Sequence, residues 1–314
     1  MELIRGLHNL RPRHRDCVAT IGAFDGVHLG HQAVIRELLA RAAALDVPAV
    51  VIVFEPLPRE YFSPLEAPAR LMSFREKLIA LARLGIDRVL GIRFDERVRS
   101  MSAREFIERV FVDGLAARFV VLGDDFRFGN DREGDLALMQ AEGRRHGFEA
   151  ASTATLALTG ERVSSTRIRE ALAAADFELT ETLLGRPYSM SGKVVYGRQL
   201  GQTIGTPTAN LRLQRLRSPL SGVFAVEVSG AGLEAAPGVA NVGTRPTVED
   251  GIEANLEVHL LDRQIALYGR FIEVTFRHKL REEMKFSGLD ELREYIATDV
   301  ANTRAWFASR ATGL

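Results

Sequence analysis

A short apolar run that leads into a glycine-rich turn constrains the fold of this chain more than any other feature. Residues 17–21 predict a buried strand, and residues 32–41 carry apolar side chains at helical spacing. Between them lies the turn Gly22-Ala23-Phe24-Asp25-Gly26-Val27-His28-Leu29-Gly30-His31. Glycines let a ligand approach the backbone, and the N–H groups at a helix N-terminus attract phosphate. We therefore expect a phosphate-binding turn between a strand and a helix.

The rest of the first half repeats this alternation of strands and helices. Further strands are predicted at residues 47–54, 87–94 and 118–123, and helices at 74–84 and 106–112. Ser73 with Glu76, and Ser102 with Glu105, have the spacing of helix capping boxes. Apolar strands that alternate with helices predict an α/β domain with a Rossmann-like parallel sheet, whose ligands bind beyond the carboxyl ends of the strands.

The pattern changes near residue 185, after which short apolar runs alternate with clusters of Gly, Pro, Ser and Asn. Strands are expected at residues 191–196, 222–228, 238–242, 252–261 and 271–276, followed by a helix over 289–307. Short strands at this spacing predict a small antiparallel β-barrel with a terminal helix. The chain of 314 residues is thus expected to form two domains, 1–185 and 186–314.

Composition narrows the classes of protein to which the chain can belong. Its formal net charge is zero, so we expect no nucleic-acid partner, and no apolar run approaches 18 residues, so we expect no membrane span. A single cysteine, Cys17, excludes an internal disulfide framework and suits a reducing cytoplasm. Because Cys17 lies in an apolar strand, it is expected to be buried and inert.

A second motif combines hydroxyls and arginines at the start of a predicted helix. Val163-Ser164-Ser165-Thr166-Arg167-Ile168-Arg169 places two arginines in the first helical turn. Basic residues there oppose the helix dipole, and an anion bound at that end explains their presence. The hydroxyls alone are equally consistent with ordinary helix capping.

These two motifs resemble the His-x-Gly-His and Ile-Ser-Ser-Thr-x-x-Arg signatures of nucleotidyltransferases. The longer string GAFDGVHLGH is similar to the N-terminal module of prokaryotic bifunctional riboflavin kinase/FAD synthetases. The resemblance implies adenylyl transfer from ATP to FMN, with His28, His31 and Arg169 as catalytic residues. It further implies nucleotide or flavin contacts at Gly22, Phe24, Asp25, Gly30, Ser164 and Thr166. Two histidines without a third ligand make a weak case for zinc.

A third stretch, Gly123-Asp124-Asp125-Phe126-Arg127-Phe128-Gly129, follows a predicted strand. It is similar to a family segment that helps to form the flavin and nucleotide pocket, which implies ligand contacts at Asp124, Phe126 and Phe128. A loop with two buried phenylalanines is the alternative. Phe54, Pro56 and Pro58 resemble another pocket-lining stretch, although prolines after a strand also end its pairing.

Glycine-rich segments and a Pro-Thr-Ala-Asn string mark the second half. Gly192-Lys193 and the run from Gly201 to Leu211 contain closely spaced glycines, which allow a backbone to wrap around phosphates. Pro207-Thr208-Ala209-Asn210 resembles the riboflavin kinase signature in which Thr and Asn bind Mg²⁺ and phosphate. The resemblance implies Thr208 and Asn210 as metal ligands, with Gly192, Lys193 and Gly205 as further nucleotide contacts.

Strand alternation places Glu253, Asn255, Glu257 and His259 on one face of a predicted strand. Spacing alone favours a solvated face, whereas Glu257 matches the family's general base for the riboflavin 5′-hydroxyl. The chain departs from the family pattern at Tyr196, Gln202, Thr206 and Arg263. We expect these departures to alter nucleotide affinity and flavin access rather than the metal-binding pair.

The resemblance therefore implies a bifunctional enzyme of flavin cofactor synthesis, present in the cytoplasm as a monomer or weak homo-oligomer. Its ligands would be riboflavin, FMN, FAD, ATP, ADP and Mg²⁺. Two alternatives stay open, namely an enzyme with a single active module and a non-catalytic protein that binds flavin or nucleotide. Because the departures from the family pattern lie in the second half, the kinase is the module whose activity is more readily expected to be absent.

Overall fold

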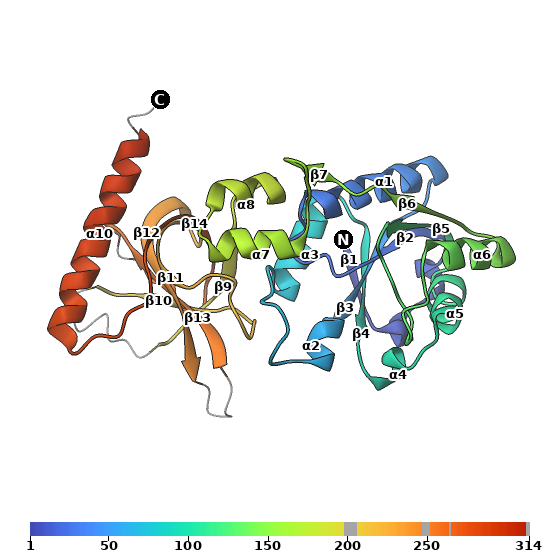
Figure 1. Cartoon of the computed structure of the whole chain (residues 1–314), viewed down its shortest axis with the longest axis horizontal. Coiled ribbons are helices and arrows are strands. Elements are labelled where there is room, and N and C mark those ends of the chain that lie inside the picture. The colour runs from blue at the N-terminus through green and yellow to red at the C-terminus, as the bar shows by residue number, and fades with distance from the viewer. Residues whose placement is uncertain (198–205, 247–251, 264, 312–314) are drawn as a thin grey trace. The chain divides into compact units, whose positions relative to one another are not determined.

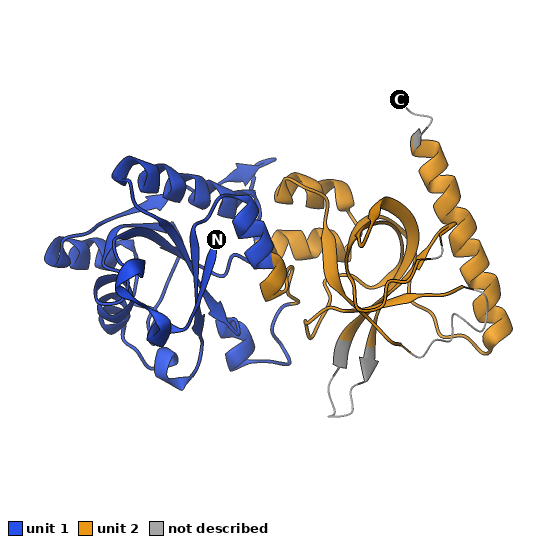
Figure 2. Ribbon diagram, turned by 180° about the vertical axis from the view of Figure 1, so that it is seen from behind, with its two compact units in different colours: residues 1–68, 77–164 blue, residues 69–76, 165–314 orange. Residues whose placement is uncertain are grey.

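The computed structural model describes residues 1–197, 206–246, 252–263 and 265–311. The chain forms two compact units, which are coloured separately in Figure 2. Unit 1 comprises Met1–Pro68 and Lys77–Ser164, and unit 2 comprises Ala69–Glu76 and Ser165–Leu314. The division falls inside one helix, α3 (Phe74–Arg83), so that segment 69–76 belongs to the unit formed by the second half of the chain.

Unit 1 is built on a six-stranded parallel sheet with the order β1-β4-β3-β2-β5-β6. Its strands are β1 (Glu2–Arg5), β2 (Cys17–Ile21), β3 (Ala49–Glu55), β4 (Arg88–Arg93), β5 (Ala117–Gly123) and β6 (Glu149–Thr153) (Figure 1). From β2 the chain proceeds to β3 and β4 on one side, whereas β5 and β6 lie on the other. Ligands of open α/β sheets bind at such a reversal, which here falls between β2 and β5.

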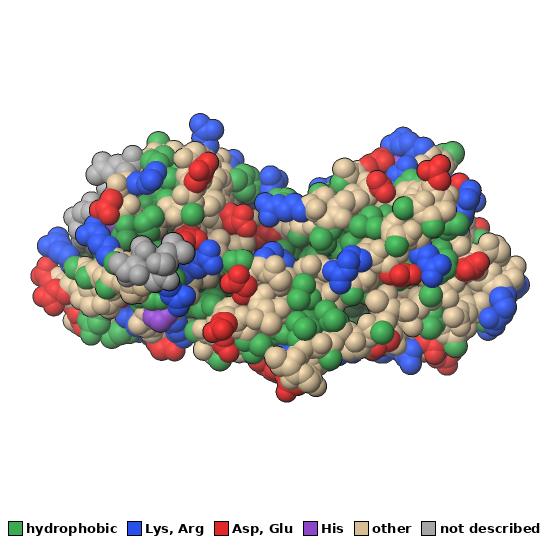
Figure 3. All heavy atoms as spheres, turned by 90° about the horizontal axis from the view of Figure 1, so that it is seen from above, with side chains coloured by type: hydrophobic (Ala, Val, Ile, Leu, Met, Phe, Trp, Pro, Cys, Tyr) green, Lys and Arg blue, Asp and Glu red, His purple; other side chains and the backbone are tan. Residues whose placement is uncertain are grey.

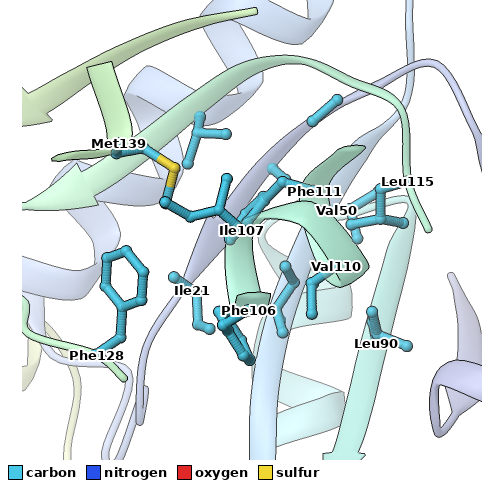
Figure 4. Packing of buried hydrophobic residues seen from close by; sticks show 14 of the residues in the cluster. Ile21, Val50, Leu90, Phe106, Ile107, Val110, Phe111, Leu115, Phe128 and Met139 are labelled. Carbon is cyan, nitrogen blue, oxygen red and sulfur yellow. The ribbon is translucent and has the colours of Figure 1, made fainter. Parts of the chain in front are cut away.

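Helices cover this sheet and enclose its core. They are α1 (Leu29–Leu45), α2 (Pro58–Phe62), α4 (Glu96–Arg99), α5 (Ala103–Phe106), the π-helical stretch η3 (Ile107–Val112) and α6 (Leu136–His146). Figure 4 shows Phe106, Ile107 and Phe111 packed against residues of the sheet. Two short 3₁₀ helices, at Leu7–Asn9 and Pro12–His14, and a hairpin of β7 (Ala157–Leu158) and β8 (Glu161–Arg162) complete the unit.

Several helices begin and end where the sequence predicts. Ser73 and Glu76 form the expected capping box, because the Ser73 N–H donates to Glu76 Oε2 at 2.6 Å and the Glu76 N–H donates to Ser73 Oγ at 3.3 Å. Ser102 caps α5 in the same position. The helix predicted over 106–112 starts earlier, at Ala103, and continues as a π-helix, a spacing that turns Phe106, Ile107, Val110 and Phe111 toward the core.

Unit 2 is a closed six-stranded antiparallel barrel with the order β10-β13-β12-β11-β14-β9. Its strands are β9 (Ser189–Val195), β10 (Ala209–Arg212), β11 (Gly222–Gly230), β12 (Leu233–Pro246), β13 (Ile252–Leu260) and β14 (Phe271–Arg281). Three helices accompany it, α7 (Ser165–Ala173), α8 (Phe177–Leu184) and α10 (Leu289–Ala311). The two predicted fold classes, a parallel α/β sheet and a small antiparallel barrel with a terminal helix, are confirmed.

A buried ion pair joins segment 69–76 to the barrel within unit 2. The guanidinium of Arg215, whose side chain is 0% exposed, donates to Glu76 Oε2, to the Tyr188 hydroxyl at 3.2 Å and to the Leu71 carbonyl at 3.4 Å. The other Glu76 oxygen accepts from the Ser191 N–H at 2.6 Å. We call Glu76, Arg215, Tyr188 and Ser191 the polar hub.

The surface chemistry agrees with the zero net charge of the sequence. On the face drawn in Figure 3, Lys and Arg side chains are interspersed with Asp and Glu. Among the described residues, no helix is both long and apolar enough to cross a membrane. Cys17 is fully buried, as predicted, and burial raises the pKa of its thiol to about 12.

Candidate functional site

The glycine-rich turn places two histidines at the N-terminus of α1. His28 is the N-cap of this helix, and its Nδ1 accepts a hydrogen bond from the His31 N–H at 3.3 Å. Because Nδ1 accepts this hydrogen bond, a neutral His28 ring carries its proton on Nε2. The two imidazoles are stacked, with their centroids 3.6 Å apart. The strand, turn and helix predicted here are therefore present, and both histidines belong to one cluster.

The surroundings of His31 favour its neutral form. Its Nδ1 is buried and has no hydrogen-bond partner in the described structure. Burial lowers the pKa of His31 well below its ordinary value, and the nearby charges of His28, Lys77 and Arg162 lower it further. A neutral imidazole can donate to a phosphate oxygen through one nitrogen.

The remaining residues of the turn shape it rather than protrude from it. Phe24 and Asp25 are both 2% exposed, and the Phe24 ring lies 5.1 Å from the His31 ring between centroids. A Cβ atom at Gly30 would lie 3.1 Å from His28 Nδ1, so only glycine leaves the His28 ring its present place without a shift. A Cβ atom at Gly22 would likewise lie 3.1 Å from the Phe24 ring. The resemblance implied that these residues contact a ligand, and the structure shows that Phe24 and Asp25 are buried in the turn.

An aromatic-lined cavity of about 300 Å³ opens beside this turn in unit 1. Segments that follow four neighbouring strands form its wall: Gly22 and Ala23 after β2, Phe54 and Pro58 around the end of β3, Phe94 and Arg99 after β4, and Phe126 to Asn130 after β5. Flat, apolar walls with a few cationic groups suit a planar aromatic ligand that carries phosphate. The cavity lies at the reversal of strand order between β2 and β5.

The loop after β5 divides its predicted residues between core and surface. Phe128 is buried and packs in the core with Phe106 (Figure 4), yet it also lines the cavity. Phe126 is half-buried and stacks on Phe128 at 5.8 Å between ring centroids. Asp124 is exposed and accepts a hydrogen bond from the Thr155 hydroxyl. Asp125 is also exposed and pairs with Arg162 at 2.8 Å, which lowers the pKa of the Asp125 carboxyl.

The second motif crosses the boundary between the units. Val163 and Ser164 belong to unit 1, where the Val163 carbonyl would lie 3.4 Å from a Cβ at Gly30. Thr166 and Arg169 lie on α7 in unit 2. Thr166 is exposed, and Arg169 Nε donates to the Ala69 carbonyl at 2.6 Å. The start of the motif is thus close to the histidine turn.

In unit 2 the predicted metal and base residues face each other across two strands. Asn210 on β10 is paired in register with Glu257 on β13, and Glu257 is in turn paired with Asn241 on β12. Residues opposite each other in a ladder lie on the same face of the sheet. Neighbours of Glu257 on the other face, Leu256 and Val258, are buried inside the barrel. The three polar residues therefore form a row on the outer face.

Other residues complete this row. Asn255, also on the outer face, donates through Nδ2 to Glu257 Oε1 at 3.0 Å. The Asn210 carboxamide lies directly over Gly197, where an added Cβ would be 2.4 Å from Asn210 Nδ2. The carboxylate of Glu283 similarly occupies the space over Gly243, which is paired in register with Asn255. Neither contact could be predicted from the sequence, since only the fold brings these segments together.

The other predicted residues of unit 2 occupy different positions. Thr208 is half-buried next to β10, and Lys193 is exposed on β9. Gly192 faces the barrel interior, where an added Cβ would lie 2.8 Å from the Arg212 carbonyl. Gly205 and Gln202 lie outside the described residues. Tyr196 stacks on Tyr268 with centroids 4.1 Å apart.

Two further observations concern metal binding and the departures from the family pattern. Within the described ranges, no three or more His, Cys, Asp or Glu side chains gather in a way that could hold a metal ion. The hydroxyl of Thr206, where the family commonly has an aromatic residue, is buried without a hydrogen-bond partner. Arg263 is exposed.

Lys77 is the site residue that sequence reasoning missed. It lies on α3 and is 1% exposed, and its Nζ donates to the Ala23 carbonyl at 2.6 Å. In the sequence, Lys77 is a single lysine within an amphipathic helix. Such a lysine is equally well explained by a position on the solvated face of the helix.

Comparisons with known proteins match a different family model to each half of the chain. The family model described as FAD synthetase matches residues 10–167, and that described as riboflavin kinase matches residues 184–307. The bifunctional riboflavin kinase/FMN adenylyltransferase of Pseudomonas fluorescens is 52% identical over 311 residues, which cover 99% of each chain. The protein of the same name from Escherichia coli strain K12 is 50% identical over 308 residues, 98% of each chain.

A solved structure is also similar over nearly the whole length. It is described as the crystal structure of a macrolide-efflux protein from Streptococcus pneumoniae and is 29% identical, with a TM-score of 0.77. The match covers 98% of this chain and 100% of that one. The two chains therefore share their fold.

Proposed function

Because this chain belongs to the family of bifunctional riboflavin kinase/FMN adenylyltransferases, we propose that it makes FMN in one module and FAD in the other. The second module phosphorylates riboflavin with ATP and releases ADP. The first module adenylylates FMN with a second ATP and releases pyrophosphate. The observation that carries this assignment is that each of the two family matches, 10–167 and 184–307, contains one of the two polar constellations described above. We place the boundary between the functional modules at residues 185 and 186.

In the first module a phosphate oxygen of FMN attacks the α-phosphorus of ATP. One P–O bond forms to the α-phosphate, the bond to the β-phosphate oxygen breaks, and pyrophosphate leaves with the electron pair. The protein must align the reactants and stabilise the negative charge of the leaving group. We assign this to the Nε2–H of His28, to His31 and to the N-terminus of α1. Ser164, Thr166 and Arg169 would bind the leaving pyrophosphate, although Arg169 also donates to the Ala69 carbonyl.

We assign the aromatic cavity of unit 1 to the flavin ring. Phe54, Phe94 and Phe126 supply aromatic walls for a planar ring, and Arg99 supplies a cation at its edge. Asp124 and Asp125 are exposed at the loop after β5, where they could accept hydrogen bonds from a ribose or from the polar edge of a ring. Phe128 would contribute mainly through packing, because it is part of the core.

In the second module the 5′-hydroxyl of riboflavin attacks the γ-phosphorus of ATP. Glu257 takes the hydroxyl proton as the new P–O bond forms, and ADP leaves as the bond between the β- and γ-phosphates breaks. The hydrogen bond from Asn255 Nδ2 to Glu257 Oε1 orients the carboxylate for this proton transfer.

Asn210 of the outer-face row and Thr208, two residues before it, suit a divalent metal bound together with ATP. The Asn210 carboxamide oxygen and the Thr208 hydroxyl are hard oxygen donors, the kind that Mg²⁺ prefers. We propose Thr208 and Asn210 as its protein ligands. When bound, Mg²⁺ would offset negative charge on the phosphates.

The proposal extends to partners and location. We propose a cytoplasmic enzyme whose partners are riboflavin, FMN, FAD, ATP and ADP, which agrees with a chain whose one cysteine is buried and unpaired. A monomer or weak homo-oligomer and the lack of a nucleic-acid partner stay predictions. Light scattering after size exclusion, and a filter-binding assay with RNA and DNA, would test them.

A chromatographic time course with riboflavin, ATP and Mg²⁺ tests both activities, with one variant in each module as the control for the other. The wild type should form FMN and then FAD. His31→Ala should stop at FMN, and Glu257→Gln should form FAD only from supplied FMN. FAD formation by His31→Ala at the wild-type rate would refute the first site, and FMN formation by Glu257→Gln at the wild-type rate would refute the base. Binding of flavin without turnover by the wild type would favour the non-catalytic alternative.

A further inference from the structure

Lys77 occupies an unusual position for a lysine. It is the only lysine among the first 192 residues of the chain, and it is 1% exposed within unit 1. Buried ammonium groups are costly unless they serve as hydrogen-bond donors to nearby acceptors. Its Nζ donates to the Ala23 carbonyl at 2.6 Å, 54 residues away in the sequence.

Ala23 precedes a part of the turn in which two residues other than glycine have left-handed backbone conformations. It lines the cavity together with Gly22, and the next residue, Phe24, has a φ of 46°. Val27, next to His28, has a φ of 42°. These left-handed conformations are unfavourable for non-glycine residues and persist only where the surroundings hold them. A hydrogen bond from a buried cation to the Ala23 carbonyl supplies such support.

The charge of Lys77 also interacts electrostatically with His31. Burial is the main cause of the lowered pKa of His31, and the positive charges of protonated His28, Lys77 and Arg162 lower it further. In a buried environment of low dielectric constant, a single positive charge acts strongly on nearby groups, anionic phosphates included. Lys77 therefore acts on the turn both through its hydrogen bond and through its field.

We propose that Lys77 is a positioning residue for adenylyl transfer: it fixes the turn that carries His28 and His31, and it places a buried positive charge next to the bound phosphates. This inference rests on the proposed function of unit 1. Lys77 acts through the backbone of the turn rather than by contact with substrate, so it is not a catalytic residue.

Three variants test the role of Lys77. Lys77→Met keeps the length of the side chain without its charge, Lys77→Arg keeps the charge, and Arg83→Met removes an exposed charge from the same helix as the matched control. We expect Lys77→Met to lower kcat for FAD formation at least tenfold and to leave FMN formation unchanged. Lys77→Arg should recover part of the loss, and Arg83→Met should stay within twofold of the wild type.

A second readout separates positioning from a merely structural role. The ring-proton shifts of His31, assigned with His31→Gln, should titrate at higher pH in Lys77→Met than in the wild type. Arg162 and His28, the other charged and titratable groups acting on His31, are unchanged in that variant. The proposal is overturned if Lys77→Met, folded as judged by its FMN formation and thermal unfolding, makes FAD within twofold of the wild type and leaves the His31 titration unchanged.

Two further outcomes are distinguishable. If the wild type makes no FAD, the proposed function of unit 1 is wrong, and this result differs from a loss seen only in Lys77→Met. If Lys77→Met does not fold, ¹⁵N-lysine labelling of the wild type gives the answer, since the chain has only four lysines: Lys77, Lys193, Lys279 and Lys285. The Lys77 signal should shift when pyrophosphate or FAD is added, and an unshifted signal at saturation overturns the proposal.

Discussion

Replacement of Glu76 by glutamine should destabilise unit 2 far more than a single hydrogen-bonding group would suggest. The Glu76 carboxylate accepts from the backbone N–H groups of Ser73 and Ser191, both at 2.6 Å, and from the guanidinium of Arg215. Glutamine has one oxygen instead of two and presents an NH₂ group to these donors. It also leaves the Arg215 side chain, 0% exposed, without its counter-charge.

The expected loss follows from the burial of the pair. Removal of one partner of a buried ion pair costs about 3–5 kcal/mol, because the remaining charge stays in a poorly solvated site. For a unit of this size that corresponds to a fall in Tm of roughly 6–20 °C. Asp262→Asn is the matched control, since Asp262 pairs with Arg304 within unit 2, where both side chains are well exposed. That change should cost about 0.5 kcal/mol or less.

Trp306 provides the assay. It is the only tryptophan in the chain and lies on α10 in unit 2, where it stacks on His278. Its fluorescence during urea unfolding therefore reports the stability of unit 2. A double-mutant cycle of Glu76→Gln with Arg215→Met should give a coupling free energy of at least about 1 kcal/mol. A loss no larger than that of the Asp262 control, or additive single variants, would refute the argument for the polar hub.

Three other predictions concern single sites. Folding lowers the pKa of His31 below the unfolded value of 6.5, so the unfolded chain takes up this proton first as the pH falls. Stability from His31 should be complete above about pH 6.5 and decline below it, and urea midpoints followed by circular dichroism should show this decline reduced in His31→Gln. Gly197→Ala should displace the Asn210 carboxamide and slow FMN formation about tenfold or more while FAD formation from FMN continues, as initial rates would show; equal rates would contradict the proposed role of Asn210. The Cys17 thiol, with its pKa raised to about 12 by burial, should not react with a disulfide reagent at pH 8 until the protein is unfolded, and rapid reaction of the native protein would contradict its burial.

Local pattern was enough to locate most elements and one of the two sites in outline. The predicted strand over 17–21 coincides with β2, and the expected capping box of Ser73 and Glu76 is present. Apolar periodicity and capping residues express preferences of neighbouring residues, so they can be read without the fold. The histidine turn was predicted for the same reason, because the strand, the turn and the helix are consecutive in the chain.

Local pattern was insufficient where pairing joins distant segments. Spacing alone favoured a solvated face for Glu257, whereas the barrel aligns this residue in register with Asn210 on the adjacent strand. β10 itself, only four residues long, was missed because it is stabilised by its ladders with β9 and β13 rather than by its own composition.

The sequence by itself thus determined the fold class of each half, the chemistry-bearing motifs and the family. Only the tertiary structure decided which strand ends surround the aromatic cavity, that Glu76 is buried against Arg215, and that Lys77 supports Ala23 from another helix. The physical reason is that strand order, register and burial of charge depend on the free energy of the whole packed unit. Groups distant in the sequence contribute to that free energy together, and no local window contains them.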